Sequence, residues 1–378
     1  MCASVLFCLG FLTACAPGVI VTGAPTPVGP AADTTPAVPA VPAPPLVRAP
    51  VVASPWPIRV REHVDLSLHG FAMLQADSTL IPYFRRDYHT QLTDARSRHG
   101  LTTLLDVNAD RLRARLTANP ALVSAQFVPL YFTTWEELRQ AADAFLRANG
   151  SPRGARDQQQ ANLVAVLAAY FPTAADRDWL QLFVLALDDE RAKFYDQYWR
   201  EQQRALGPVF DAADRAWRNE FAGRFARFLN NSQQRDGEIL LSLPLGGEGR
   251  TLAVPNRPTA VAVGFPADST TATAMVYVFA HEIIGATANA VVTDNTSPAD
   301  RRNGAADRYT SLAAVRGGAM LLGRLAPELV TGYMQYYLGL ARRPGSADVE
   351  HSFAATFPLP DALRDALQRQ IDIILGGI

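Results

Sequence analysis

Cysteine is almost absent from this chain. The three cysteines, Cys2, Cys8 and Cys15, all lie near the N-terminus, and the remaining sequence contains none. A disulfide framework or a cysteine-based metal site in the body of the protein is therefore excluded.

The chain also lacks an excess of charge of either sign. Lys and Arg number 35 against 36 Asp and Glu, and no long run of like charge occurs. Proteins that bind nucleic acid usually carry a basic patch or stripe, so we expect no nucleic-acid partner. Hydrophobic residues make up 48% of 378 residues, which is enough for a well-buried core.

Several catalytic motifs are missing. The chain contains no G-x-S-x-G elbow, no C-x-x-C pair and no G-x-G-x-x-G loop, so the sequence gives no support for a serine hydrolase of that type, a thioredoxin-like protein or a dinucleotide-binding protein. The stretch PLGGEGRT, residues 244–251, lacks the Gly-Lys-Ser/Thr ending of a phosphate-binding loop and leads into a predicted strand. It is predicted to be a turn between two strands, with Glu248 and Arg250 beside a possible cleft.

The first fourteen residues are short and mostly apolar, which is typical of a signal peptide. Cys15 follows them, and the segment Leu12-Thr13-Ala14-Cys15 resembles the lipobox of bacterial lipoproteins. That resemblance implies cleavage before Cys15, lipidation of Cys15, and a location in the bacterial cell envelope with the domain outside the cytoplasm and the membrane as a partner through the anchor. An ordinary secretory signal is the alternative.

Residues 15–57 are rich in Pro and Ala and are predicted to form a flexible tether. From residue 58 to residue 378 the pattern predicts one globular domain that is mainly α with a small β-sheet, an α+β fold. Long helices are expected at about 156–170, 175–200 and 206–229. Hairpin-like strands are expected within about 237–265.

A buried helix is predicted from about residue 273 to residue 292, and it carries His281 and Glu282 in otherwise apolar or small surroundings. Its length would allow it to span a membrane, but His, Glu and Asn near its centre disfavour this, so a core helix is the preferred interpretation. Inside a protein the two polar side chains need partners, because an uncompensated buried carboxylate is costly.

His281 and Glu282 resemble the start of the H-E-x-x-H helix of zincin metallopeptidases. A zincin-like bacterial group of poorly known function has a helix that reads approximately H-E-F-S-H-S-F-V-N, and His281, Glu282 and Asn289 match its first, second and ninth positions. The resemblance covers about residues 58–300. It implies that His281 is a zinc ligand, that Glu282 is a general base, and that the strand at residues 259–265 binds an extended substrate along its edge.

The chain departs from the zincin motif at Gly285, which replaces the second ligand histidine and offers no donor atom. Asp294 follows the helix and is a further candidate for lining the site. His63 and His69 lie six apart on a predicted helix, so we expect at most one of them to point inward with His281. The candidate replacement ligands are three acidic residues and three histidines: Asp300, Asp307, Glu328, His63, His69 and His351.

Three hypotheses remain open. The first is a zincin-like lipoprotein without standard zinc peptidase activity, with no cofactor expected, that binds a peptide or an envelope component. The second is a metal-dependent peptidase with unconventional ligands, for which zinc is the ion considered and at least two further ligand groups must converge on His281 and Glu282. The third is a helical lipoprotein unrelated to zincins, in which both side chains are buried and hydrogen-bonded within the protein.

Overall fold

Helices make up most of the computed structural model, which describes residues 56–75, 80–253, 257–343 and 347–376. The prediction of a mainly α protein with a small sheet is confirmed. The chain divides into two units, Met1–Val51 and Val52–Ile378. The predicted signal peptide, Cys15 and nearly all of the predicted tether lie outside the described residues.

The helices include the long ones that the sequence predicts and several others that it does not. The α-helices are α1 (Glu62–Leu74), α2 (Tyr88–Arg98), α3 (Leu104–Val107), α4 (Ala109–Ala118), α5 (Trp135–Arg147), α6 (Gln158–Tyr170), α7 (Ala174–Glu190), α8 (Asp196–Ala205), α9 (Gly207–Ala216), α10 (Ala222–Asn231), α11 (Ala274–Asn295), α12 (Pro298–Arg302), α13 (Ala305–Leu325), α14 (Val330–Leu340), α15 (Val349–Thr356) and α16 (Asp361–Gly376).

Short helical turns of other kinds connect several of these helices. The 3₁₀ segments are η1 (Pro120–Tyr131), η2 (Pro152–Gly154), η5 (Ser269–Thr271) and η6 (Pro327–Leu329), and the π-helical turns are η3 (Arg191–Tyr195) and η4 (Trp217–Phe221). The two π-helical turns join α7 to α8 and α9 to α10, so each of the long helices expected at 175–200 and 206–229 runs on through a local change of pitch.

Four strands form one mixed sheet in the order β1-β2-β4-β3. They are β1 (Ile58–Arg59), β2 (Gly237–Ser242), β3 (Arg250–Leu252) and β4 (Thr259–Gly264). The pairs β1–β2 and β2–β4 are parallel, and only β3–β4 is antiparallel. The expectation of hairpin-like strands therefore holds for the antiparallel pair β3–β4 and is wrong for the parallel pair β2–β4. Both are buried along almost their whole length, which is typical of parallel strands covered on two faces.

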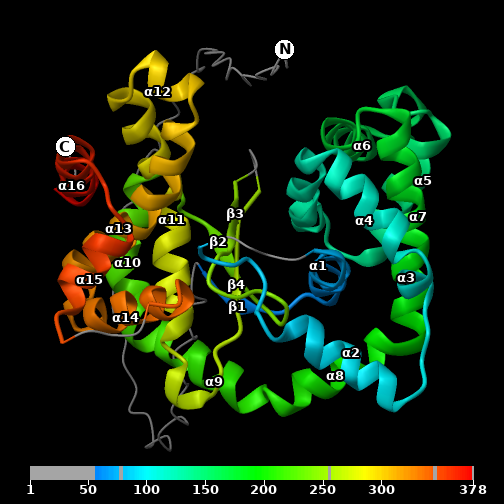
Figure 1. Cartoon of the computed structure of the whole chain (residues 1–378), viewed down its shortest axis with the longest axis horizontal. Coiled ribbons are helices and arrows are strands. Elements are labelled where there is room, and N and C mark those ends of the chain that lie inside the picture. The colour runs from blue at the N-terminus through cyan, green and yellow to red at the C-terminus, as the bar shows by residue number, and fades with distance from the viewer. Residues whose placement is uncertain (1–55, 76–79, 254–256, 344–346, 377–378) are drawn as a thin grey trace, which may run out of the picture. The chain divides into compact units, whose positions relative to one another are not determined.

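Helices pack on both sides of this sheet. Figure 1 shows α10, α11 and α13–α16 gathered on one side of it and α1–α7 on the other. Helix α11 contacts β4 and β3 directly and packs on its other flanks against α13, α16 and α14. It is therefore an interior helix that joins the sheet to the C-terminal helices.

Close packing around α11 fixes its position. Phe279 lies edge-on to the rings of Trp56, Trp217 and Phe225, with ring centroids 5.3, 4.8 and 5.6 Å away. On the opposite flank, a Cβ atom at Gly317 of α13 would come within 3.0 Å of Ile284. Gly317 therefore lets α13 approach α11 closely at Ile284, which precedes Gly285 in the chain.

Candidate metal centre

Helix α11 carries His281 and Glu282 into the interior. Nearly every residue from Met275 to Ile284 is buried. Among the described helices, only this one, counted with its preceding turn as Ser269–Asn295, is long and apolar enough to cross a membrane by length and composition. Here it packs against α13, α16 and β4, as the core helix of a folded domain does.

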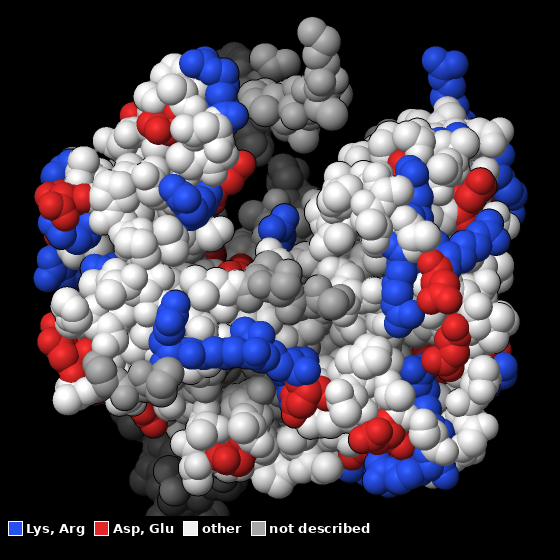
Figure 2. Space-filling model, in the orientation of Figure 1, with Lys and Arg blue, Asp and Glu red and all other residues white. Residues whose placement is uncertain are grey.

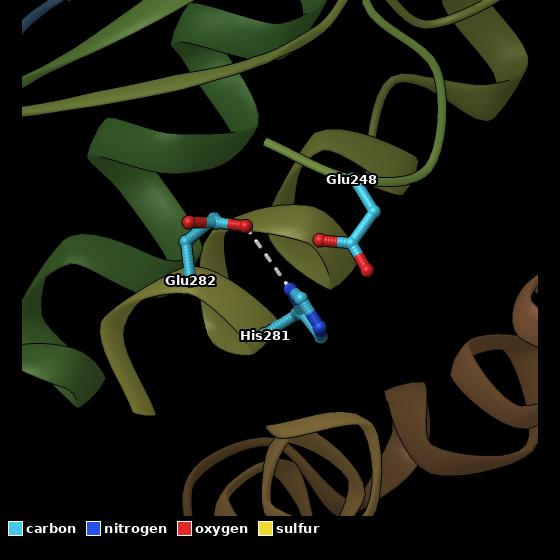
Figure 3. Close-up of side chains that lie close together, drawn as sticks. All are labelled: Glu248, His281 and Glu282. Atoms are coloured by element: carbon cyan, nitrogen blue, oxygen red, sulfur yellow. Dashed lines mark hydrogen bonds and ion pairs between the residues drawn. The ribbon is translucent and has the colours of Figure 1, made fainter. Parts of the chain in front are cut away.

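Three side chains converge at this point of α11 (Figure 3). His281 Nδ1 lies 3.1 Å from Glu282 Oε1. Glu248, from the loop between β2 and β3, turns its carboxylate toward the imidazole. One donor atom from each of the three residues lies within 4.8 Å of the other two. The site is well shielded, since the side chains of His281 and Glu282 are 6% and 9% exposed.

The loop that carries Glu248 is held by hydrogen bonds on both sides of that residue. Tyr337 of α14 donates its hydroxyl to the Gly247 carbonyl at 3.3 Å, and the Gly249 amide donates to Glu282 Oε1 at 3.1 Å. The loop therefore binds to α14 and to α11 at once. The turn predicted at residues 244–251 thus becomes the element that delivers Glu248 to the helix.

The surroundings of His281 favour positive charge. Burial alone lowers the pKa of His281, but the charge of Glu248, together with the hydrogen bond and charge of Glu282, outweighs burial and raises that pKa above its usual value. The ring of Tyr337 stacks on the imidazole at a centroid distance of 5.5 Å. Without a metal ion the two carboxylates therefore favour the protonated form of His281, and a bound cation would take over the role of that proton.

The donor set fits a divalent ion in charge and in kind. Two carboxylates and a neutral imidazole carry a total charge of −2, and both ligand types bind zinc, with manganese and iron as alternatives. Metal–ligand distances for zinc are about 2.0–2.2 Å. Atoms already within 4.8 Å of one another therefore need only modest side-chain adjustment to share one ion. Compared with H-E-x-x-H, Glu248 supplies a carboxylate in place of the missing histidine.

The other residues proposed to line the site lie elsewhere. Arg250 is exposed, and its guanidinium lies over the Phe127 ring at 5.5 Å. Asn289 and Asp294 are also exposed, further along α11. Since a helix rises about 1.5 Å per residue, Asp294 is on the order of 18 Å from Glu282 along the axis. Only Glu248 of the predicted lining residues joins the pair.

The acidic residues considered as third ligands are not at the site. Asp300 accepts hydrogen bonds from the Ser297 amide and hydroxyl at 3.1 and 2.7 Å and so caps α12. Asp307 is exposed in the first turn of α13, and Glu328 forms an ion pair with Arg224. All three candidates follow the helix in sequence, whereas Glu248 precedes it.

The remaining histidines also have other partners or positions. Helix α1 is buried along almost its whole length, so both His63 and His69 are interior, and neither joins the donor atoms around His281. His63 Nε2 lies 3.0 Å from the Phe132 carbonyl. His69 Nε2 lies 3.0 Å from Glu190 Oε1, in a second buried polar network that no local sequence pattern indicates. His351 is exposed on α15.

Gly285 lies one helical turn after His281, beside open space. A Cβ atom built there meets no heavy atom within 4 Å. Residues four apart lie on the same face of a helix. The position where a zincin has its second histidine is therefore free of neighbouring side chains.

The sheet edge nearest the site belongs to β3. Strand β4, predicted to bind a substrate along its edge, is interior because β2 pairs with one side and β3 with the other. The expectation for residues 259–265 is therefore wrong. The edge of β4 is not free because the short segment Arg250–Leu252, which is β3, pairs antiparallel with it and forms the outer strand.

Comparison of the chain with protein families, with curated proteins and with solved structures finds no match. The similarity to zincins therefore depends on the residues of α11.

Proposed function

We propose that this protein is an envelope lipoprotein whose domain binds one divalent cation at Glu248, His281 and Glu282 and does not use the standard zinc-peptidase mechanism. One observation carries the proposal. Glu248 belongs to a separate loop, yet one of its carboxylate oxygens lies within 4.8 Å of a donor atom of His281 and of Glu282. Anchoring through Cys15 stays a prediction from the sequence, which membrane fractionation of wild type and Cys15→Ser would test.

The hydrogen bonds of Glu282 favour a role in binding the cation over a role as a catalytic base. Its Oε1 atom accepts from the Gly249 amide and lies within hydrogen-bond distance of His281 Nδ1, and Thr251 Oγ1 lies 3.5 Å from Oε2. A general base needs an oxygen that can reach the attacking water. With Glu282 engaged in this way, the chemistry that the three residues support is cation binding.

Binding of an extended peptide is the function we propose for the adjacent surface. Strand β3 is the outer strand of the described sheet on the side that contacts α11, and it follows Glu248 directly. Outer strands recognise peptides through their free backbone amides and carbonyls. A cation at Glu248 would hold the start of β3 against α11 and so shape that edge.

The alternative of a purely structural cluster is favoured by one observation. His281 is only 5% exposed, and both His281 and Glu282 have hydrogen-bond partners within the protein. In that case a protonated His281 and the two carboxylates form a buried ion cluster that stabilises the loop against α11, with no metal.

Metal content distinguishes these possibilities. The full chain and the variants Glu248→Gln and His281→Ala would be analysed for bound metal, with Glu328→Gln as the matched control at an exposed carboxylate. We expect nearly stoichiometric metal in wild type and in the control and little in the two site variants, because each removes one of three donors. We also expect chelation to lower the melting temperature of wild type but not of Glu248→Gln.

Absence of metal from wild type, even after incubation with zinc or manganese, would overturn the proposal. If both site variants were then merely less stable, the structural cluster would be the remaining explanation.

A further inference from the structure

Basic side chains from separate parts of the chain converge on a cavity that has no part in the metal centre. The cavity has a volume of about 760 Å³ and lies among the end of α1, the start of α2, α4, and the residues after α14. This volume is in the range of sites that hold small molecules. Its basic lining residues are Arg85, Arg86, His89, Arg113 and Arg342.

The rest of the lining is largely apolar, and the described part of the chain places no carboxylate in it. The apolar lining residues are Ala72, Met73, Leu74, Pro82, Phe84, Leu116 and Val123. The cavity therefore offers a hydrophobic wall together with several guanidinium groups.

The positive charge in the cavity is only weakly compensated. Arg85 lies 3.7 Å from Asp87, and Arg113 lies 3.5 Å from Asp110, whose side chain is fully exposed. Exposed pairs of this kind contribute little. Arg342 is exposed and has no ion pair among the described residues.

Two further observations agree with an electropositive cavity. Burial and then the nearby charges of Arg113 and Arg96 lower the pKa of His89, so that its neutral form is favoured there. Figure 2 shows a continuous band of basic side chains on the drawn face, between the places where α14 and α2 lie in Figure 1. The nearly neutral net charge of the chain does not reveal this cluster, because the fold brings the basic residues together from separate segments.

We propose that this cavity binds the phosphate group of a ligand that also has an apolar portion. Guanidinium groups bind phosphate oxygens through paired, charge-assisted hydrogen bonds, and several of them around one cavity suit a group with more than one negative charge. The apolar wall would receive the hydrocarbon part of the same molecule. A soluble phosphate ester and the headgroup of an anionic lipid share this chemistry.

The test uses the full chain and two probes. Binding of hexyl phosphate would be measured by calorimetry, and binding to phosphatidylcholine vesicles with and without phosphatidic acid by co-sedimentation. Arg342→Gln is the test variant, and Arg343→Gln is its matched control, because Arg343 is the exposed neighbouring arginine that does not line the cavity. Arg113→Gln is a second test variant, with its melting temperature checked because Arg113 also donates to the Met73 carbonyl.

We expect saturable binding that falls about tenfold or more in Arg342→Gln and Arg113→Gln and by less than about twofold in Arg343→Gln, since only the first two variants remove a charge-assisted hydrogen bond to the phosphate. Binding of hexyl phosphate without preference for phosphatidic acid vesicles would support the proposal with a soluble ligand. Binding dependent on phosphatidic acid would support it with a lipid headgroup. No saturable binding of either probe, or equal losses in Arg342→Gln and Arg343→Gln, would overturn it.

Discussion

Gly285 is the residue at which this chain departs from a zinc-peptidase helix, and its surroundings leave room for the missing side chain. A Cβ atom at this position meets nothing within 4 Å, on the helix face that His281 shares. No neighbouring side chain therefore packs against this position. Glu248 supplies a donor from a separate loop, so the cluster has three donor groups without residue 285.

Replacing this glycine with histidine should strengthen metal binding. Gly285→His would place a second imidazole one turn after His281, at a position where a Cβ atom meets no neighbour within 4 Å. Loss of even an indirect partner of a metal ligand costs about ten- to hundredfold in affinity, so an added ligand should tighten zinc binding by at least about tenfold. Competition with a chromophoric chelator measures this.

Gly323→His is the control for that experiment, because Gly323 is also helical and open to space but belongs to α13, away from the centre. Unchanged zinc affinity in Gly285→His would show that the residue 285 position does not face the donor atoms.

At the scale of elements, the loop and β3 form one unit that depends on close backbone approach at Gly249. A Cβ atom there would lie 2.3 Å from the Ala262 carbonyl of β4 and 3.1 Å from Glu282 Cγ. The carbonyl belongs to the strand backbone and cannot move aside cheaply. Any larger residue must push β3 away from β4, and with it the amide that binds Glu282.

Gly249→Ala should therefore destabilise the protein by about 1–3 kcal/mol, as overpacking does, and weaken metal binding as well. Chemical denaturation measures the first effect and metal titration the second. Gly223→Ala in α10 is the control, since its Cβ meets nothing within 4 Å and the change should stabilise the helix by about 0.5–1 kcal/mol. Equal stability of the two variants would contradict this account.

Elements determined by nearby residues could be predicted from the sequence. Helix α5 begins after Thr134, whose side chain accepts from the Glu137 amide at 3.1 Å, and Gly150 follows the helix with a φ of +88°. Both features are visible in the sequence as a cap and a stop signal. The spacing of Thr134 and Glu137 is typical of a capping box, but only half of that motif forms, because the Glu137 side chain accepts hydrogen bonds from Thr133 and not from Thr134.

Features that depend on distant residues could not be predicted in this way. The parallel pairing of β2 with β4 and the insertion of β3 at the outer edge are choices of topology, which local patterns do not determine. The same limit applied to the candidate site. His281 and Glu282 were found from their motif, but the role of Glu248 depends on where a glycine-rich loop folds.

At the scale of the whole molecule, Asp65 joins the helices on one side of the sheet to the sheet itself. It is 1% exposed in α1, and its Oδ2 accepts from the Trp199 indole of α8 at 2.9 Å. Burial raises the pKa of Asp65 to about 7, although hydrogen bonds from the end of β2 and from Trp199 act in the opposite direction. The folded protein therefore keeps a proton on Asp65 that the unfolded chain releases at a lower pH.

This raised pKa makes stability fall as pH rises. Between the unfolded pKa of 3.8 and the folded value of about 7, the folded state binds more protons than the unfolded state, so the contribution of Asp65 to unfolding free energy decreases with pH. Relative to Asp65→Asn, wild type should lose about 2–3 kcal/mol of stability from about pH 5 to about pH 8. Urea denaturation of both proteins at the two pH values measures the difference, and parallel pH profiles would refute the raised pKa.

The first described residues are bound to a part of the chain made much later. The Trp56 indole donates to the Gln234 carbonyl, 178 positions away, and Ile58 of β1 pairs with Ile239 of β2, 181 positions away. All helices from α1 to α10 thus lie in sequence between two strands that are neighbours in the sheet. Closing so long a loop has an entropic cost that slows folding. A chain synthesised from its N-terminus must hold β1 unpaired until β2 emerges. The centre on α11 is assembled later still, so a metal bound there would report that the sheet is complete.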